Sequence, residues 1–389
     1  MSAYPVHLAR RMDAIAPFHV MDIIARTHAL EAEGRSIIHM EVGEPDFATA
    51  APIVEAGHRA LSEGRTRYTA SAGISELRQA IADFYRSRYQ LALPPERILV
   101  TPGASGALQL ATAVLVNPGE QILMADPGYP CNRHFVRLVE GEPVGIPVGA
   151  NSYYQLDAEQ VERYWSAKTV GVLLASPSNP TGTLVSRTAL EGILEVVQRR
   201  GGRVIMDEIY HGLIYDHEAV SALALSDQLF VVNSFSKYFG MTGWRLGWLV
   251  APDAYIRDAE KLAQNLFLAP SAPAQYAALA AFTPETLAIC EQRRHEFKAR
   301  RDFLLPALRE LGFTIPLVPQ GAFYLYADCS RFTDDSYRFA FDLLDQAGVA
   351  CTPGIDFGEH LAAQHLRFAY TNSLAKLAEG VERLRKVLL

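Results

Sequence analysis

Residues 234–247 read SFSKYFGMTGWRLG and directly follow a short apolar run, LFVVNS (229–234). The run predicts a strand buried on both faces of a sheet, so Lys237 should lie just beyond its carboxyl end. A partly desolvated amine loses proton affinity there and can act as a nucleophile toward a carbonyl. A single lysine after a strand is more often a solvated loop residue, so the interpretation depends on the other strand ends.

Further apolar runs predict the rest of this sheet. They alternate with amphipathic patterns such as GALQLATAVLV (106–116) and RTALEGILEVVQRR (187–200), which predict covering helices. The sequence therefore indicates an α/β fold with a mostly parallel sheet. The runs are RILVT (97–101), QILMA (121–125), VGVLLA (170–175), RVIMD (203–207) and RLGWLV (245–250).

The two ends of the chain follow a different pattern. Residues 7–33 predict a helix broken near Pro17, and residues 284–312 predict one long charged helix. Strand-like AFYLYA (322–327), strand-like HLRFAYT (365–371) and a closing helix follow. We therefore expect a large domain over 46–284 and a smaller α/β domain made from 1–45 and 285–389.

Composition narrows the classes of function. With 389 residues, 49% hydrophobic content and a net charge of −7, the chain suits a globular protein without a broad basic surface for nucleic acid. Its four cysteines are far apart and include no CxxC pair, which favours reduced thiols over a zinc site or a disulfide framework. The N-terminal residues do not resemble a signal peptide and no membrane-spanning run follows, so we expect a cytoplasmic protein.

Several residues that directly follow predicted strands could bind a ligand. The small-residue turn 102–106 opens a helix and could bind a phosphate, although such turns also occur without one. Asp207 needs a partner, which could be a protonated ring nitrogen or backbone N–H groups of the next turn. Asn179 could offer an amide to a ligand, and Tyr129 could pack or stack on a ring. With Lys237, these groups suit a cofactor that carries both a phosphate and an aldehyde.

The motifs as a set resemble the class I/II aminotransferases of fold type I, which depend on pyridoxal 5′-phosphate. This resemblance covers nearly the whole chain and implies a mostly parallel seven-stranded sheet in the large domain. The motifs are VGEPDF, YTASAGISELRQAIADFY, PSNPTG, DEIY, SFSKYFGMTGWRLGW and LRFAYTNS.

The resemblance implies a role for each candidate residue around the cofactor. Lys237 would bind the cofactor aldehyde covalently and then move a proton as base and acid. Asp207 would pair with the pyridinium nitrogen, Tyr129 would stack on the ring, and Asn179 and Tyr210 would bind its phenolic oxygen. The phosphate would be held by the backbone of Ala104 and Ser105 together with Ser234, Ser236 and Arg245.

Three further residues gain a role only through the resemblance. Arg367, otherwise interpreted as a structural salt-bridge residue, would clamp the substrate carboxylate with Asn179, and the backbone of Gly43 would approach the same group. Tyr68, otherwise ordinary turn packing, would reach the phosphate of a neighbouring subunit. The resemblance therefore implies a homodimer with shared active sites.

The expected substrate is a neutral or broad range of L-amino acids, with 2-oxoglutarate or pyruvate as acceptor in a ping-pong reaction. Aspartate-specific relatives place a lysine where Ser105 stands and an arginine near Leu266, and residues 15–18 (IAPF) predict an apolar pocket wall. Both departures weaken an aspartate aminotransferase assignment, which stays an alternative.

Other classes of function remain open from the sequence. A carbon–sulfur lyase or other β-eliminase on the same fold would share Lys237 and Asp207. A dinucleotide-binding oxidoreductase could use the glycine turn with Asp126, although GxGxxG is absent. A non-catalytic ligand-sensing module is the third alternative, and the lack of an appended DNA-binding segment weighs against it.

Overall fold

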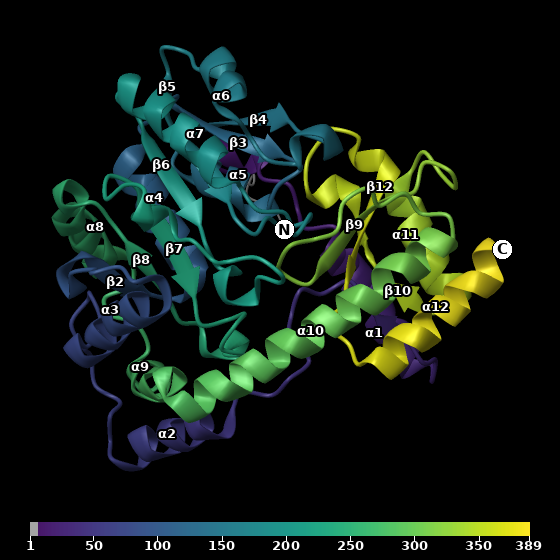
Figure 1. Cartoon of the computed structure of the whole chain (residues 1–389), viewed down its shortest axis with the longest axis horizontal. Coiled ribbons are helices and arrows are strands. Elements are labelled where there is room, and N and C mark those ends of the chain that lie inside the picture. The colour runs from purple at the N-terminus through teal and green to yellow at the C-terminus, as the bar shows by residue number, and fades with distance from the viewer. Residues whose placement is uncertain (1–6) are drawn as a thin grey trace, which may run out of the picture.

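A seven-stranded sheet forms the centre of the computed structural model, which describes residues 7–389 (Figure 1). The strand order is β2-β8-β7-β6-β5-β3-β4, and β8 runs antiparallel to the other six strands. The predicted α/β fold with a mostly parallel sheet is thus confirmed. The strands are β2 (Ile98–Thr101), β3 (Gln121–Asp126), β4 (Glu142–Pro147), β5 (Thr169–Ala175), β6 (Arg203–Asp207), β7 (Phe230–Ser234) and β8 (Gly247–Val250).

Edge strand β4 was missed by the sequence analysis. Its sequence, EPVGIP, contains two prolines and only one fully buried residue, Ile146, so it lacks the continuous apolar run of a central strand. Proline is tolerated at the edge of a sheet because no further strand needs its N–H group.

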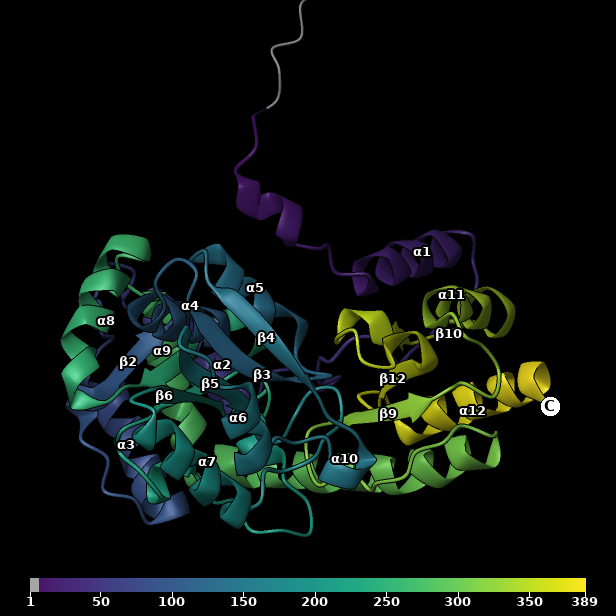
Figure 2. The same cartoon turned by 90° about the horizontal axis from the view of Figure 1, so that it is seen from above.

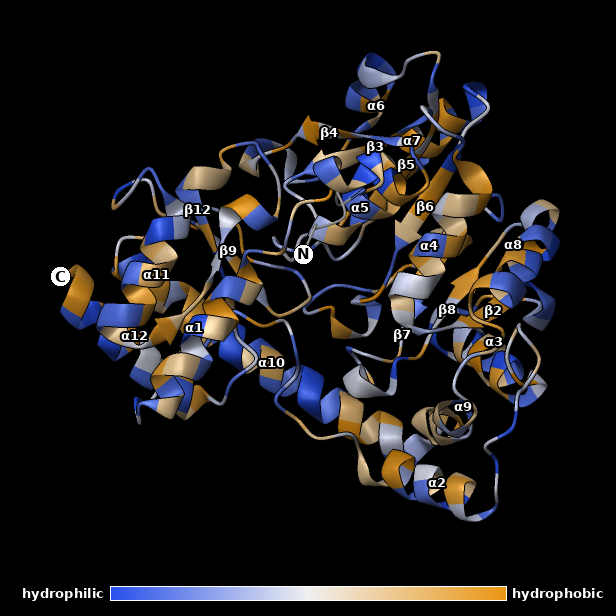
Figure 3. Cartoon of the chain, turned by 180° about the vertical axis from the view of Figure 1, so that it is seen from behind, coloured by the Kyte–Doolittle hydropathy of each residue, from blue (hydrophilic) through white to orange (hydrophobic). Residues whose placement is uncertain are grey.

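Alternate residues of each central strand supply two separate cores. On β6, for example, Ile205 packs on one face while Val204 and Met206 pack on the other. Figure 3 shows apolar residues concentrated on strands such as β6 and polar residues on the outer sides of the helices. The first face is covered by α4 (Gly103–Leu115), α5 (Pro130–Leu138) and α8 (Asp253–Leu266), and the second by α3 (Ser75–Tyr89), α6 (Ala158–Tyr164), α7 (Arg187–Arg199) and α9 (Ala272–Leu279).

A smaller group of elements is built from both ends of the chain (Figure 2). It contains the antiparallel sheet β11-β12-β9 and the parallel pair β1-β10. Its strands are β1 (Ile38–His39), β9 (Tyr324–Asp328), β10 (Val349–Ala350), β11 (Thr352–Pro353) and β12 (His365–Ala369), flanked by α1 (Val20–Ala32), α11 (Ser336–Ala347) and α12 (Leu374–Leu388).

One long helix joins the two groups. In Figure 1, α10 (Pro284–Glu310) runs from α9 and α2 (Ala51–Ser62) beside the large sheet to α12 in the smaller group. The domain boundaries at residues 45 and 284 stay a prediction.

Three smaller predictions concern the chain as a whole. The helix expected over 7–33 is a 3-10 turn at Arg10–Ala14 and then α1, so it breaks around Pro17 as predicted. Cys131, Cys290, Cys329 and Cys351 form no disulfide in the part of the chain that the structure describes. No helix within residues 7–389 is long and apolar enough to cross a membrane.

Candidate active site

A cavity of about 420 Å³ lies at the carboxyl ends of β5, β6 and β7, between the large sheet and the smaller group of elements. It brings together all of the predicted site residues except Ser234 and Tyr68. Those that line it are Gly43, Ala104, Ser105, Tyr129, Asn179, Asp207, Tyr210, Ser236, Lys237, Arg245 and Arg367.

Lys237 enters the cavity three residues after the end of β7. Its amine donates a hydrogen bond of 2.7 Å to the carbonyl oxygen of Gly43. Desolvation lowers the pKa of Lys237 to about 8, although the charges of Glu44 and Asp207 act in the opposite direction. About a tenth of the amine is therefore unprotonated at pH 7, far more than for an exposed lysine, and available to attack a carbonyl.

Asp207 ends β6 and is only 5% exposed. Burial raises its pKa to about 6, against the lowering effects of the Ile209 N–H group and the Lys237 charge. The Ile209 N–H group donates to Oδ1 at 3.0 Å, so the backbone alternative raised by the sequence accounts for one hydrogen bond. A carboxylate accepts several, which leaves Asp207 able to bind a cationic N–H group in the cavity.

A candidate anion site lies at the N-terminus of α4, whose first-turn residues Ala104 and Ser105 line the cavity and whose first N–H groups have no partner within the helix. Gly103 has a φ of +69°, and a Cβ atom there would lie 2.7 Å from a guanidinium nitrogen of Arg245. Glycine therefore lets the guanidinium pack against the start of the helix. Together the helix N-terminus and Arg245 suit a phosphate.

Ser234 lies behind this anion site and does not line the cavity. Its hydroxyl donates to the carbonyl of Leu246 at 3.1 Å or to the Ser236 hydroxyl at 2.9 Å, and it accepts the Ser236 N–H at 3.0 Å. Ser234 thus orients Ser236, which does line the cavity.

Arg367 lies on β12 and is 6% exposed. It donates to Asn179 Oδ1 at 3.0 Å, to the Glu41 carbonyl at 2.6 Å and to Thr352 Oγ1 at 3.2 Å, all uncharged acceptors. Its Nε is buried without a hydrogen-bond partner in the described chain. The structural salt bridge suggested by the residue alone is therefore wrong, and a buried cation without a carboxylate favours an incoming anion.

Comparison with known proteins identifies the family. Residues 35–384 match the family model described as aminotransferase class I and II. The chain belongs to this family. Its members use pyridoxal phosphate to move amino groups between amino acids and oxo acids.

Three similar proteins match almost the whole length of this aminotransferase. The (5-formylfuran-3-yl)methyl phosphate transaminase of Methanocaldococcus jannaschii is 37% identical, over 98% of this chain and 99% of the relative. The valine–pyruvate aminotransferase of Mycobacterium tuberculosis is 35% identical, over 95% and 96%. The structure of Thermus thermophilus aspartate aminotransferase with maleate has a TM-score of 0.93 at 33% identity and covers 99% of this chain and 100% of that one.

The cavity of this aminotransferase fits the family cofactor in its chemistry. It contains an amine with a lowered pKa, a carboxylate with unused hydrogen-bond capacity and a helix N-terminus beside a guanidinium. These three groups match the aldehyde, the ring nitrogen and the phosphate of pyridoxal 5′-phosphate.

Sequence reasoning missed part of the cavity wall of the aminotransferase. Phe18 lines the cavity as the apolar segment 15–18 predicted, but Ile15, Ala16 and Pro17 do not. Further apolar lining includes Val20, Met21 and Ile24 on α1 and Leu108 on α4. The helical spacing of Val20 and Ile24 would have indicated one face of a helix, but not what that face contacts.

Tyr324, at the start of β9, was also missed. The sequence around Tyr324 predicts only a strand-like segment without a functional role. Only the pairing of β9 with β12, on which Arg367 lies, brings it into the site.

Three residues that the sequence analysis discussed, Tyr68, Leu266 and Asp126, also lie outside the cavity. Tyr68 is 84% exposed and Leu266 is 46% exposed, and neither lines the cavity. Asp126, the acid that an oxidoreductase would need for a ribose, accepts hydrogen bonds from the N–H groups of Glu359 and His360 through both oxygens. Asp126 therefore acts as a structural cap.

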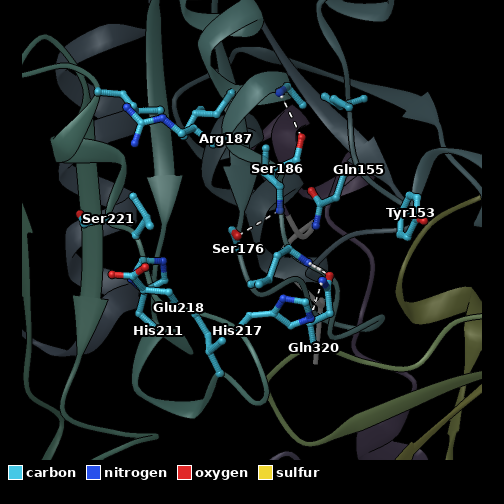
Figure 4. Close-up of a pocket in the computed structure, with 18 of the residues that line it drawn as sticks. Tyr153, Gln155, Ser176, Ser186, Arg187, His211, His217, Glu218, Ser221 and Gln320 are labelled. Atoms are coloured by element: carbon cyan, nitrogen blue, oxygen red, sulfur yellow. Dashed lines mark hydrogen bonds between the residues drawn. The ribbon is translucent and has the colours of Figure 1, made fainter. Parts of the chain in front are cut away.

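A larger hollow of about 660 Å³ lies on the other side of the turn after β5 (Figure 4). None of the predicted site residues line it. Several of its polar groups are engaged within the chain, since Ser186 Oγ accepts the Ala189 N–H and Ser176 Oγ accepts the Val185 N–H. The predicted site residues are therefore gathered at the smaller cavity and not at this hollow.

Proposed function

We propose that this aminotransferase binds pyridoxal 5′-phosphate on Lys237 and moves the amino group of a neutral or broad range of L-amino acids to 2-oxoglutarate or pyruvate. The observation that carries the proposal is that Lys237 and Arg367, neither of them paired with a carboxylate within residues 7–389, line one cavity with Asp207. A nucleophilic amine and a carboxylate-binding guanidinium are the two groups that an amino acid substrate needs.

The residues at the strand ends would hold the cofactor. The backbone of Ala104 and Ser105 binds its phosphate with Ser236 and Arg245, while Ser234 orients Ser236. Asp207 is mostly ionised at pH 7, because its pKa is about 6, and holds a proton on the ring nitrogen. When bound, the protonated ring withdraws electrons from the substrate carbon.

Three further contacts would position the cofactor ring. Tyr129 would stack on it, and Asn179 and Tyr210 would donate hydrogen bonds to its phenolic oxygen. Asn179 also accepts from Arg367 at 3.0 Å, so one amide serves both the cofactor and the substrate clamp.

Lys237 and Arg367 would then carry out the substrate steps. Arg367 binds the carboxylate with two charge-assisted hydrogen bonds, each worth roughly 1.5 to 3 kcal/mol. Because Gly43 has no side chain, its backbone can lie close to the same carboxylate. The Lys237 amine removes the proton from the α-carbon and returns a proton as an acid in the second half of the reaction.

The preference for a neutral side chain rests on the apolar wall of the cavity. Phe18, Val20, Met21 and Ile24 are apolar, and the described lining contains no cation beyond Lys237, Arg245 and Arg367. With two of these cations serving the cofactor, a side-chain carboxylate would lack a partner. Pyruvate as acceptor is supported by the name of the Mycobacterium tuberculosis relative, a valine–pyruvate aminotransferase.

We also propose a homodimer with shared active sites. Tyr68 is 84% exposed, so a contact between its hydroxyl and a cofactor phosphate requires a second copy of the chain. Mixing the Lys237→Ala protein with the Tyr68→Phe protein, at a cofactor concentration too low to saturate the second variant, tests this arrangement. Recovery of activity in the mixture is expected, and its complete absence would contradict shared sites.

The main experiment combines cofactor and substrate tests. The purified protein should be yellow, and after borohydride reduction the cofactor mass should lie on the peptide that contains Lys237. A panel of alanine, valine, leucine, phenylalanine and aspartate should bleach the colour and release 2-oxo acids. Release of ammonia would favour a β-eliminase, and a preference for aspartate above about tenfold, or 1.4 kcal/mol, would favour an aspartate aminotransferase.

A further inference from the structure

Tyr324 contacts three of the site residues from one position at the start of β9. It is 1% exposed and lines the same cavity as they do. The residues it meets are Tyr210, Gly43 and Arg367.

The first contact joins two phenols. The hydroxyl oxygens of Tyr324 and Tyr210 lie 2.8 Å apart, a short hydrogen bond in which either can donate. Burial raises the pKa of both phenols, so each keeps its proton. If Tyr210 donates its proton to a ligand oxygen in the cavity, its own oxygen is left to accept the proton of Tyr324.

The second contact explains the glycine at position 43. A Cβ atom on Gly43 would lie 1.8 Å from the Tyr324 hydroxyl oxygen and 2.8 Å from Cζ of the ring. Only glycine therefore admits the hydroxyl group here. The carbonyl of the same Gly43 accepts the Lys237 amine at 2.7 Å, so the phenol and the amine meet one peptide segment.

The third contact is with the guanidinium of Arg367. Its Cζ lies 4.3 Å from the centre of the Tyr324 ring, within the range of a cation–π interaction. The register of the two strands produces this contact, because Tyr324 pairs with Ala369, two residues beyond Arg367.

We propose that Tyr324 is a positioning residue with two separable parts: its hydroxyl supports hydrogen-bond donation by Tyr210, and its ring supports the Arg367 guanidinium. The inference rests on the proposed function, in which Tyr210 binds the phenolic oxygen of the cofactor and Arg367 binds the substrate carboxylate.

Tyr324→Phe removes the hydroxyl and keeps the ring. Weaker donation by Tyr210 leaves more negative charge on the phenolic oxygen, and that charge favours the protonated form of the nearby Lys237 nitrogen. We expect the pKa of the Lys237 nitrogen in the cofactor-bound protein to rise by roughly 0.4 to 1 unit, the equivalent of one neutral hydrogen bond. The absorbance of the bound cofactor as a function of pH measures this pKa. The KM for amino acids should change less than about twofold because the cation–π contact remains.

Tyr324→Leu removes both parts. We expect the same rise in pKa together with a KM increase of roughly 3- to 30-fold for all amino donors, irrespective of side chain. The matched control is Tyr326→Phe on the same strand, since the Tyr326 hydroxyl is buried without a hydrogen-bond partner in the described chain. That control should change neither quantity.

The outcomes separate this inference from the proposed function. If the wild-type protein binds the cofactor and transaminates but Tyr324→Phe titrates as the wild type does, the inference about the hydroxyl is wrong and the proposed function stands. If Tyr324→Phe only lowers Tm without a pKa shift, the role is structural and the inference is again contradicted. If the wild-type protein takes up no cofactor on Lys237, the proposed function itself fails.

Discussion

Asp207 and Asp126 end two strands of the same sheet, yet their surroundings differ. Asp126, at the end of β3, uses both carboxylate oxygens to accept backbone N–H groups of residues 359 and 360. Asp207, at the end of β6, accepts one backbone N–H group and lines the cavity. An aspartate at the end of a strand can therefore use both carboxylate oxygens for hydrogen bonds within the chain, as Asp126 does. It can also keep hydrogen-bond capacity open toward a cavity, as Asp207 does.

The buried arginines show the same contrast. Arg300 on α10 is 2% exposed and pairs with Asp46 at 2.8 Å and with Glu296 at 3.2 Å. Arg367 has comparable burial but only uncharged partners. Burial alone does not mark a functional charge; the missing counter-charge does.

The largest effect is expected from Lys237→Ala. Loss of the amine removes both covalent attachment and proton transfer, so transamination should fall by about four orders of magnitude or more. Single-turnover assays with a bound amino acid measure this loss, while noncovalent cofactor binding should remain. Near-normal turnover in this variant would show that Lys237 is a spectator.

Asp207→Asn is expected to give the next largest effect. Without the carboxylate the ring nitrogen loses its proton, so kcat should drop by roughly 10²- to 10⁴-fold. The folded pKa of Asp207 is raised to about 6, so stability from this group is lost as pH rises toward 6. The Tm of the cofactor-free variant at pH 7 should therefore be equal to or above that of the wild type. A large drop in Tm would mean that Asp207 stabilises the fold through its hydrogen bonds, as Asp126 does.

The effect of pH on the rate of cofactor uptake should lie between the effects of Asp207→Asn and Asp126→Asn in size. Since the pKa of Lys237 is lowered to about 8, the rate constant for uptake by cofactor-free protein should rise with pH and level off above that value. Below it, each unit should change the rate by about tenfold. Stopped-flow absorbance between pH 6 and pH 10 measures the midpoint; a midpoint near 10.5, the value of an exposed lysine, would mean that the amine is solvated.

Asp126→Asn should give the smallest effect on activity. Asparagine keeps one acceptor oxygen, so the loss of the other should cost about 1 to 2 kcal/mol of unfolding free energy. The turnover per folded molecule should stay within about twofold, because Asp126 does not line the cavity. Chemical denaturation and active-site titration separate the two quantities, and a kcat loss equal to that of Asp207→Asn would remove the distinction between the two acids.

The sequence predicted the sheet and most of the cavity because both depend on local patterns. Buried strands read as apolar runs, and ligand groups follow directly after them, as Asp207 and Lys237 do. The edge strand β4 escaped because half-exposed residues and prolines carry no such pattern.

The remaining site residues depend on pairings between distant segments. Tyr324 reaches the cavity through the register of β9 with β12. The N-terminus of α1, whose apolar residues line the cavity, is held by Asp356, which accepts the N–H groups of His19 and Val20 at 2.8 and 2.9 Å. Family resemblance supplied the role of Arg367, which the residue alone suggested wrongly.

The single antiparallel strand of the large sheet has a mechanical consequence. β8 returns alongside β7, with Val232 opposite Leu249 and Ser234 opposite Gly247. The loop that carries Lys237 and Arg245 therefore begins and ends in the same pair of hydrogen-bonded strands. The spacing of these two cations is thus set by a closed loop of backbone hydrogen bonds within the large sheet. A rotation of the smaller group of elements would carry Arg367 toward or away from them while leaving the amine-to-guanidinium distance unchanged.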